Sequence, residues 1–188
     1  MKKLSVITMI ALAACMFQAC SGNKDSAETA DSINAERDSA YAVAVDESDA
    51  KFAVDAANGG MAEVALGKLA QSKASNAKVK EFADMMVADH SKANDELMAL
   101  AQLKNITLPI AVSEEKQSTM NDLTKKAGSD FDKAYVDQMI DDHKSTVSMF
   151  EDASANAKDV DIRAFAAKTL PTLKAHLQHI NAIHDSMK

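Results

Sequence analysis

Apolar residues recur with a helical period along this chain from residue 49 onward. Steps that alternate between three and four positions place apolar side chains on one face of a helix, and no strand-like alternation extends beyond a few residues. This spacing predicts four long helices, over residues 49–74, 77–104, 129–157 and 159–186. A shorter polar helix is expected between Ser113 and Lys126, with Ser113 as its N-cap.

The four long helices form two similar pairs. A shift of 83 positions, which carries Phe52 onto Tyr135, aligns the first pair with the second without a gap from Phe52 to Asn94. The connection between the pairs, about 25 residues, is long enough to run the length of a bundle. We therefore predict an all-α fold, a ferritin-like four-helix bundle made of two similar helical hairpins with a long crossover that contains a short helix. An up-down-up-down bundle with an elaborate loop is the alternative.

The composition agrees with a helical bundle and excludes several other classes of protein. Apolar residues make up 47% of the 188 residues and charged residues 26%, so the chain can bury a core. Only 5 glycines and 2 prolines, with no tryptophan, disfavour a turn-rich β-sandwich or barrel. The net charge is −7, whereas a nucleic-acid-binding surface is basic. No nucleic acid is therefore expected as a partner.

The first twenty residues predict export. Lys2 and Lys3 precede the apolar run 4–14, which is too short to span a bilayer as a helix. The sequence has two cysteines: Cys15 directly follows this run, and Cys20 comes five residues later. A cysteine after an export signal, preceded by a small residue, resembles the bacterial lipoprotein box, in which that cysteine carries the lipid. We favour Cys20 for lipid attachment because a polar stretch follows it; Cys15 is the alternative, and a simple secreted protein is a further one.

These features divide the chain into three parts. Residues 1–19 are expected to be a lipoprotein signal peptide, residues 20–48 a flexible tether rich in Ser, Ala, Asp and Glu, and residues 49–188 the four-helix bundle domain. The expected location is the bacterial cell envelope, with the lipid anchored in the outer membrane at its periplasmic or surface face. The membrane is the partner that this anchor implies, and the sequence identifies no protein partner.

Each long helix carries one strongly polar residue in its apolar seam, and these residues are Glu63, His90, His143 and His176. Glu63 and His90 lie equally far from the turn between their helices, about 20 Å at 1.5 Å per residue. His143 and His176 lie equally far from their own turn, about 25 Å by the same rise. In a bundle about 45 Å long with its turns at opposite ends, all four lie at one level. With both turns at one end, the pairs would be about one helical turn apart.

This polar layer predicts a metal site. A buried polar group is costly unless it bonds to another group, to water or to a metal. Imidazoles and carboxylates are common ligands of zinc, copper and iron, and three His with one Glu complete a tetrahedron. We therefore predict that Glu63, His90, His143 and His176 bind one ion of zinc, copper or iron. The alternative is a hydrogen-bonded network of the same side chains that fixes packing and binds nothing.

Two aspartates directly precede predicted ligands. Asp89 comes before His90 and Asp142 before His143, about 100° away around each helix. At that angle they are not partners of their own histidine. We expect them on the helix flanks, where each is placed to orient a histidine of a neighbouring helix.

The sequence does not indicate an enzyme. The di-iron centre of ferritin-like proteins needs Glu-x-x-His on each of two helices, and here the third residue before each predicted ligand histidine is apolar. No nucleophile or additional general base is recognisable. We expect a non-enzymatic binding or accessory module, and the alternative is a structural or protein-interaction lipoprotein whose buried layer only fixes packing.

Several short motifs resemble the domain of unknown function 4142 family. They are GGMAEV at 59–64, VADHSKAN at 87–94, Asp142-His143, and Leu170-Pro171 followed by His176-Leu177. The resemblance extends over about residues 49–186. It implies a ferritin-like helical bundle in an exported bacterial protein, often a lipoprotein, and it implies no activity. The predicted metal site rests on the residues themselves and not on this resemblance.

Overall fold

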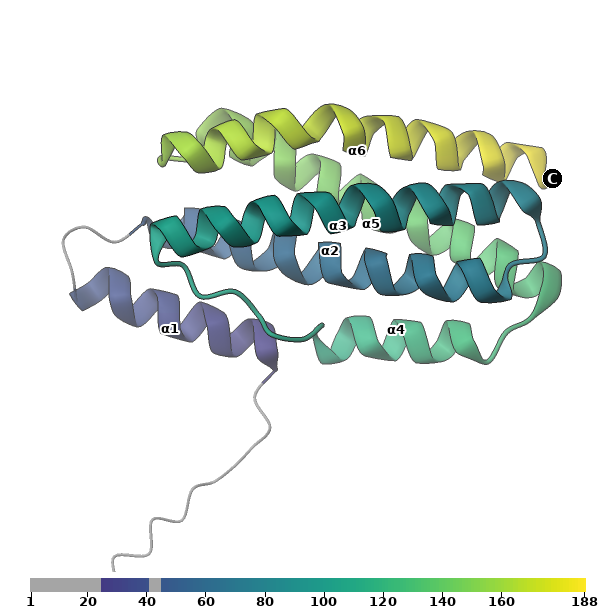
Figure 1. Cartoon of the computed structure of the whole chain (residues 1–188), viewed down its shortest axis with the longest axis horizontal. Coiled ribbons are helices and arrows are strands. Elements are labelled where there is room, and N and C mark those ends of the chain that lie inside the picture. The colour runs from purple at the N-terminus through teal and green to yellow at the C-terminus, as the bar shows by residue number, and fades with distance from the viewer. Residues whose placement is uncertain (1–24, 41–44) are drawn as a thin grey trace, which may run out of the picture.

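The computed structural model describes residues 25–40 and 45–188 (Figure 1). Within them it has six helices and no strand. The helices are α1 (Ser26–Ala40), α2 (Glu47–Lys73), α3 (Ala77–Lys104), α4 (Glu114–Thr124), α5 (Gly128–Asn156) and α6 (Val160–Ser186). The predicted signal peptide, Cys15 and Cys20 lie outside the described residues. In the described part of the chain, no helix combines the length and hydropathy that crossing a membrane requires.

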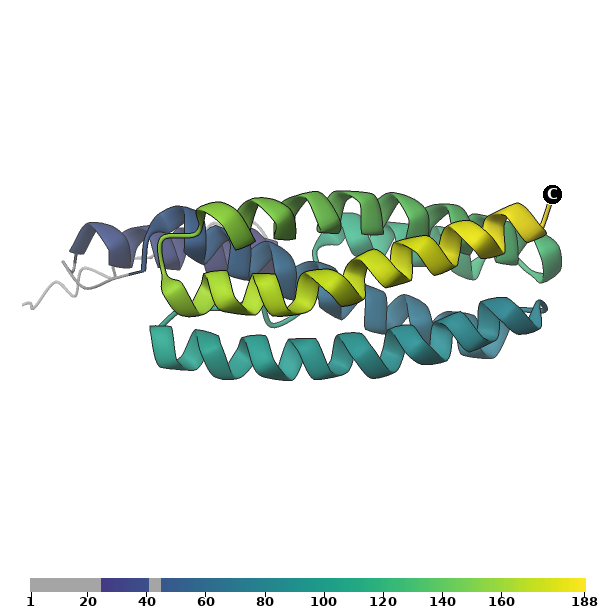
Figure 2. The ribbon, with the colours of Figure 1, turned by 90° about the horizontal axis from the view of Figure 1, so that it is seen from above.

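Two antiparallel hairpins, α2–α3 and α5–α6, form the bundle, and their turns lie at opposite ends (Figures 1 and 2). Helix α2 packs against α5 and α3 against α6. The connection from α3 runs back along the bundle and includes α4, so α3 and α5 run in the same direction (Figure 1). The predicted ferritin-like topology with a long crossover is confirmed, and the up-down-up-down alternative is excluded.

The two halves make the same contact at their turns. Asp132 at the start of α5 accepts hydrogen bonds from the backbone N–H groups of Ser75 and Asn76, at 3.0 and 2.9 Å. Asp49 on α2 accepts from the backbone N–H groups of Lys158 and Asp159, at 3.2 and 2.6 Å. The 83-position shift aligns these two buried aspartates, so each hairpin holds the turn of the other in an equivalent way.

The core consists of two apolar clusters, one toward each end of the bundle. Toward the α5–α6 turn, the rings of Phe52, Phe150 and Phe165 pack with centroids 5.0 and 6.0 Å apart. Toward the α2–α3 turn, the second cluster is built around Phe82 and Tyr135. Burial of these side chains, which contributes about 25 cal/mol per Å² of apolar surface, holds the four helices together. The predicted polar layer lies between the two clusters.

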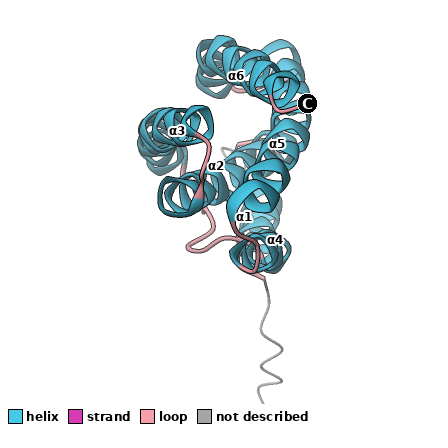
Figure 3. Ribbon diagram, turned by 90° about the vertical axis from the view of Figure 1, so that its right-hand side faces the viewer, coloured by secondary structure: helices cyan, strands magenta, loops and turns pink. Residues whose placement is uncertain are grey.

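Helix α1 corrects part of the predicted flexible tether over residues 20–48. It packs against α2, and α4 lies against α2 and α5 on the outside of the bundle (Figure 3). Asn34 is buried and exchanges two hydrogen bonds with the backbone of Thr107, at 2.8 and 2.9 Å. Arg37 donates to the carbonyl of Asn105 at 2.7 Å. Polar side chains that satisfy loop backbone therefore order this segment, which has little apolar surface of its own.

Candidate metal centre

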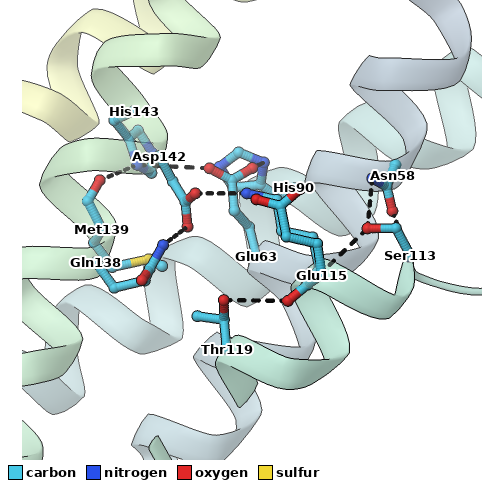
Figure 4. A network of polar contacts seen from close by, with 11 residues as sticks. Asn58, Glu63, His90, Ser113, Glu115, Thr119, Gln138, Met139, Asp142 and His143 are labelled. Carbon is cyan, nitrogen blue, oxygen red and sulfur yellow. Dashed lines mark hydrogen bonds and ion pairs between the residues drawn. The ribbon is translucent and has the colours of Figure 1, made fainter. Parts of the chain in front are cut away.

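The four predicted residues meet in the middle of the bundle, one from each long helix. Glu63 comes from α2, His90 from α3, His143 from α5 and His176 from α6, and between 0% and 6% of each residue is exposed. The prediction that they share one level is confirmed. Figure 4 shows Glu63, His90 and His143 side by side at this level. The opposed turns of the two hairpins bring four residues that are distant in the sequence to one height.

The three histidine rings surround a common centre. Their centroids are 5.4, 5.5 and 5.7 Å apart, which is close to an equilateral triangle. Each ring offers one nitrogen such that these atoms all lie within 4.8 Å of one another. A point therefore exists within about 2.8 Å of all three nitrogens, and an inward shift of about 0.7 Å would give the 2.0–2.1 Å of a Zn–N bond. Small ring rotations provide such a shift.

One nitrogen of each ring has no hydrogen-bond partner among the described residues. These atoms are Nε2 of His90, Nε2 of His143 and Nδ1 of His176. The other nitrogen of each ring is engaged: His90 Nδ1 lies 3.0 Å from Glu63 Oε2, His143 Nδ1 lies 2.9 Å from the carbonyl oxygen of Met139, and His176 Nε2 lies 3.0 Å from Asp89 Oδ2.

All three of these outer partners are acceptors, so each ring donates its N–H outward. The tautomer that results leaves a lone pair on the inner nitrogen of each ring. We infer that the three unpartnered nitrogens are the ones that face the common centre. An unpaired buried polar atom costs about 1–3 kcal/mol, so buried lone pairs are expected to have a partner. Lone pairs that converge without a donor are therefore typical of a metal site.

Glu63 contacts two of the three histidines. It is predicted as a fourth ligand, but its carboxylate lies against the outer nitrogens, 3.0 Å from His90 Nδ1 and 3.5 Å from His143 Nδ1. Both contacts are to the Nδ1 atoms and not to the unpartnered Nε2 atoms of the two rings. Its role in this geometry is to orient the two histidines and to supply negative charge beside them.

Two glycines bring α2 and α3 close together beside Glu63. A Cβ atom added at Gly60 would lie 2.0 Å from Asn94 Oδ1. A Cβ atom added at Gly67 would lie 2.8 Å from Val87 Cγ2 and 3.2 Å from the carbonyl oxygen of Ala83. These contacts occur one helical turn before and after Glu63, so the missing side chains let its carboxylate reach His90.

The electrostatics of the layer favour neutral imidazoles at His143 and His176 and an ionised carboxylate at Glu63. Burial lowers the pKa of His143 and of His176, and the hydrogen bond that His176 makes to Asp89 only partly opposes this. Burial by itself would raise the pKa of Glu63, but the adjacent His90 and His143 outweigh it and hold that pKa below its usual value. Neutral imidazole is the form that binds a metal, and a nearby carboxylate charge stabilises a bound cation.

The two aspartates singled out in the sequence have different roles. The prediction that Asp89 orients a histidine of a neighbouring helix is confirmed by its contact with His176. Asp142 instead pairs with Lys116 on α4 at 2.7 Å. It also accepts a hydrogen bond from Gln138 at 3.1 Å (Figure 4). The carbonyl of Met139 has no counterpart in the sequence prediction, because a backbone acceptor leaves no signal in a side-chain pattern.

Comparison with known proteins identifies one family and a small group of similar folds. The family described as "Domain of unknown function (DUF4142)" matches residues 34–183. No curated protein sequence matches the chain significantly.

Three solved structures share the fold at low sequence identity. A DUF305 fragment from Deinococcus radiodurans has a TM-score of 0.68 and 10% identity, over 76% of this chain and 99% of that one. CopM in the Cu(II)-bound form has a TM-score of 0.63 and 15% identity, over 74% and 97% of the two chains. CopM in the Cu(I)-bound form has a TM-score of 0.63 and 16% identity, over 73% and 96%. At these identities the likeness shows the fold alone.

Proposed function

Because the chain belongs to the DUF4142 family, whose name assigns no activity, we propose a function from its buried site: the domain binds one transition-metal ion through His90, His143 and His176. Glu63 and Asp89 orient these ligands through their outer nitrogens. The ion would place a positive charge beside the three nitrogen lone pairs and the Glu63 carboxylate.

A single observation carries this proposal: three buried histidines each bring a ring nitrogen within 4.8 Å of the others, and each ring has one nitrogen without a hydrogen-bond partner among the described residues. A layer that served packing alone would be expected to pair these nitrogens with side chains, because each unpaired buried nitrogen destabilises the fold. Here the outer nitrogens of all three rings are paired and the inner ones are not. The acceptors beside the outer nitrogens fix the tautomers of the three rings. The inner nitrogens are then available to bind a cation.

Copper is the first ion to test. A set of three neutral imidazoles suits zinc, copper and iron, and affinity for divalent ions rises along the Irving–Williams order to copper. CopM, whose fold is similar, is described in Cu(II)-bound and Cu(I)-bound forms, which supports this order of testing. Zinc is the second ion, because three histidines are also a common zinc ligand set.

The role that we propose is binding rather than turnover. Three protein ligands leave one coordination position for water or for another small ligand. The cavity beside Glu63 and His90 has a volume of about 30 Å³, enough for one or two waters, and it is lined mainly by apolar side chains. Within this cavity a larger substrate has no space, which favours an accessory or storage function.

We further propose that the domain works in the bacterial cell envelope as a lipoprotein, with a lipid on Cys20 anchored in the outer membrane. The export signal and the cysteine that follows it support this location, with Cys15 as the alternative attachment site. Incorporation of labelled palmitate into the wild type and into Cys20→Ala tests the attachment site. Label retained in Cys20→Ala and lost in Cys15→Ala would move the anchor to Cys15.

Metal content tests the binding function. The purified protein is stripped with a chelator, dialysed against Cu²⁺, Zn²⁺ or Fe²⁺, and analysed for the ratio of metal to protein. We expect one ion per chain in the wild type and none in His90→Ala/His143→Ala, with circular dichroism to verify the helical fold. His184→Ala is the matched control, since His184 lies on α6 outside the cluster and should leave binding intact. A wild-type protein that binds no metal would refute the proposal and leave the layer a packing network.

A further inference from the structure

A surface pocket of about 400 Å³ lies between α2, α4 and α5, directly outside the metal layer. Its charged lining residues are Asp55, Glu63, Glu115, Lys116, Asp141 and Asp142. Five of these six side chains are acidic. We call this the acidic pocket. One wall is held in place by Asn58 on α2, which accepts from the backbone N–H of Ser113 at 2.8 Å and donates to its hydroxyl at 3.1 Å (Figure 4).

Glu63 connects the acidic pocket with the histidines. It lines the pocket, yet only 2% of the residue is exposed, so it lies at the inner end. Its Oε2 atom contacts His90, while its Oε1 atom lies 3.5 Å from His143 Nδ1 and has no hydrogen-bond partner among the described residues. A buried carboxylate oxygen without a donor, at the inner end of an acidic pocket, is suited to a cation and not to an anion.

We propose that the acidic pocket is the entrance through which a divalent cation reaches the three-histidine site, with the Glu63 carboxylate at its inner end. This inference rests on the proposed metal-binding function. Exposed carboxylates at the mouth raise the local concentration of cations, as charged clefts do for ligands of opposite sign. Glu63 lines the pocket and also contacts His90, so its carboxylate adds negative charge where the pocket meets the histidines.

Lys116 opposes this passage. Its ammonium group lies 2.7 Å from Asp142 at the pocket wall, and its charge also acts on the Glu63 carboxyl, where it helps to lower the pKa. A fixed positive charge beside the route repels an incoming cation. Removal of this charge should therefore accelerate metal uptake, whereas removal of acidic charge should slow it. Asp142 keeps its hydrogen bond from Gln138 when Lys116 is replaced, so the wall retains a contact.

The rates of Zn²⁺ binding and release test the route. The ion-free protein is mixed with Zn²⁺ in a stopped-flow instrument with a fluorescent zinc indicator, and release is started with excess chelator. We expect Glu115→Gln/Asp141→Asn to slow both rates about three- to tenfold at low salt, and Lys116→Met to accelerate both by a similar factor. The effects should nearly vanish at 1 M salt, where the screening length is about 3 Å. Equilibrium affinity should stay within about threefold of wild type, because the ligands and Glu63 are unchanged.

Glu151→Gln/Asp185→Asn is the matched control, since it removes the same two charges from exposed positions outside the pocket. Wild-type rates in this control, with slower exchange in the pocket variant and faster exchange in Lys116→Met, would support the route. Wild-type rates in both pocket variants, in a protein that binds zinc, would overturn the route and leave the metal site standing. A pocket variant in which only the release rate changes, so that the zinc affinity changes with it, would also overturn the route. A wild-type protein that takes up no zinc, copper or iron would overturn both proposals.

Discussion

Replacement of Gly67 by alanine tests whether the close approach of α2 and α3 is as tight as the structure indicates. The added Cβ atom would lie 2.8 Å from Val87 Cγ2, and rotation of Val87 would still leave it 3.2 Å from the backbone oxygen of Ala83. Overpacking of this kind costs about 1–3 kcal/mol. Alanine in a helix recovers about 0.5–1 kcal/mol relative to glycine. Gly67→Ala should therefore lower the free energy of unfolding by about 1 kcal/mol.

Gly59→Ala is expected to change the free energy of unfolding in the opposite direction, in the same helix. A Cβ atom at Gly59 meets nothing within 4 Å, so the helix gains about 0.5–1 kcal/mol and loses no packing. Urea unfolding of both variants without metal, followed by far-ultraviolet circular dichroism, measures the difference. We expect the two free energies to differ by about 1–3 kcal/mol, which is the overpacking cost alone. Two variants that are equally stabilised would refute the tight contact, and with it the explanation of how Glu63 reaches His90.

Three further predictions concern the site and α1. Glu63→Gln should weaken metal binding about 10–100-fold, because it removes the charged acceptor that orients two ligands, and isothermal titration against the wild type measures this; unchanged affinity would contradict that role. The ion-free protein should lose stability as the pH falls below about 6.5, because burial lowers the folded-state pKa of His143 and His176 and the unfolded chain therefore takes up protons first. Urea midpoints at pH 7.5 and 5.0 check this, and an unchanged midpoint would contradict the lowered folded-state pKa of the two histidines. Asn34→Ala should release α1 by leaving two backbone groups of Thr107 unpaired, a cost of about 1–3 kcal/mol. Limited proteolysis should then cleave within residues 25–40 well before the bundle, and equal resistance in both proteins would show that other contacts hold α1.

The helices and their order could be predicted from sequence because the signal is long and repeated. The first long helix is predicted over 49–74 and observed at Glu47–Lys73, and the third is predicted over 129–157 and observed at Gly128–Asn156. An apolar face that persists for seven turns leaves little freedom in where a helix begins or ends. The level of the four polar residues followed from counting 1.5 Å per residue from each turn.

The role of Glu63 could not be predicted in the same way. Helical phase gives the direction in which a side chain leaves the backbone, but not which edge of a neighbouring ring it meets. That outcome depends on the spacing of α2 and α3, which Gly60 and Gly67 set through contacts with residues of the other helix. Helix α1 escaped prediction for a related reason, because Asn34 and Arg37 bind backbone groups of a distant loop and leave no apolar pattern.

The cavity beside the polar layer shows how the two similar hairpins differ. The 83-position shift carries the four residues of the layer onto other positions of the sequence, which are Thr146, Leu173, Gly60 and Ala93. All four line that cavity. The two similar hairpins thus repeat the scaffold without repeating the ligands, and the equivalent positions form a small, mostly apolar layer. A symmetric dimer of identical hairpins would have two matching layers. The single three-histidine centre therefore requires two hairpins that differ in sequence at these positions.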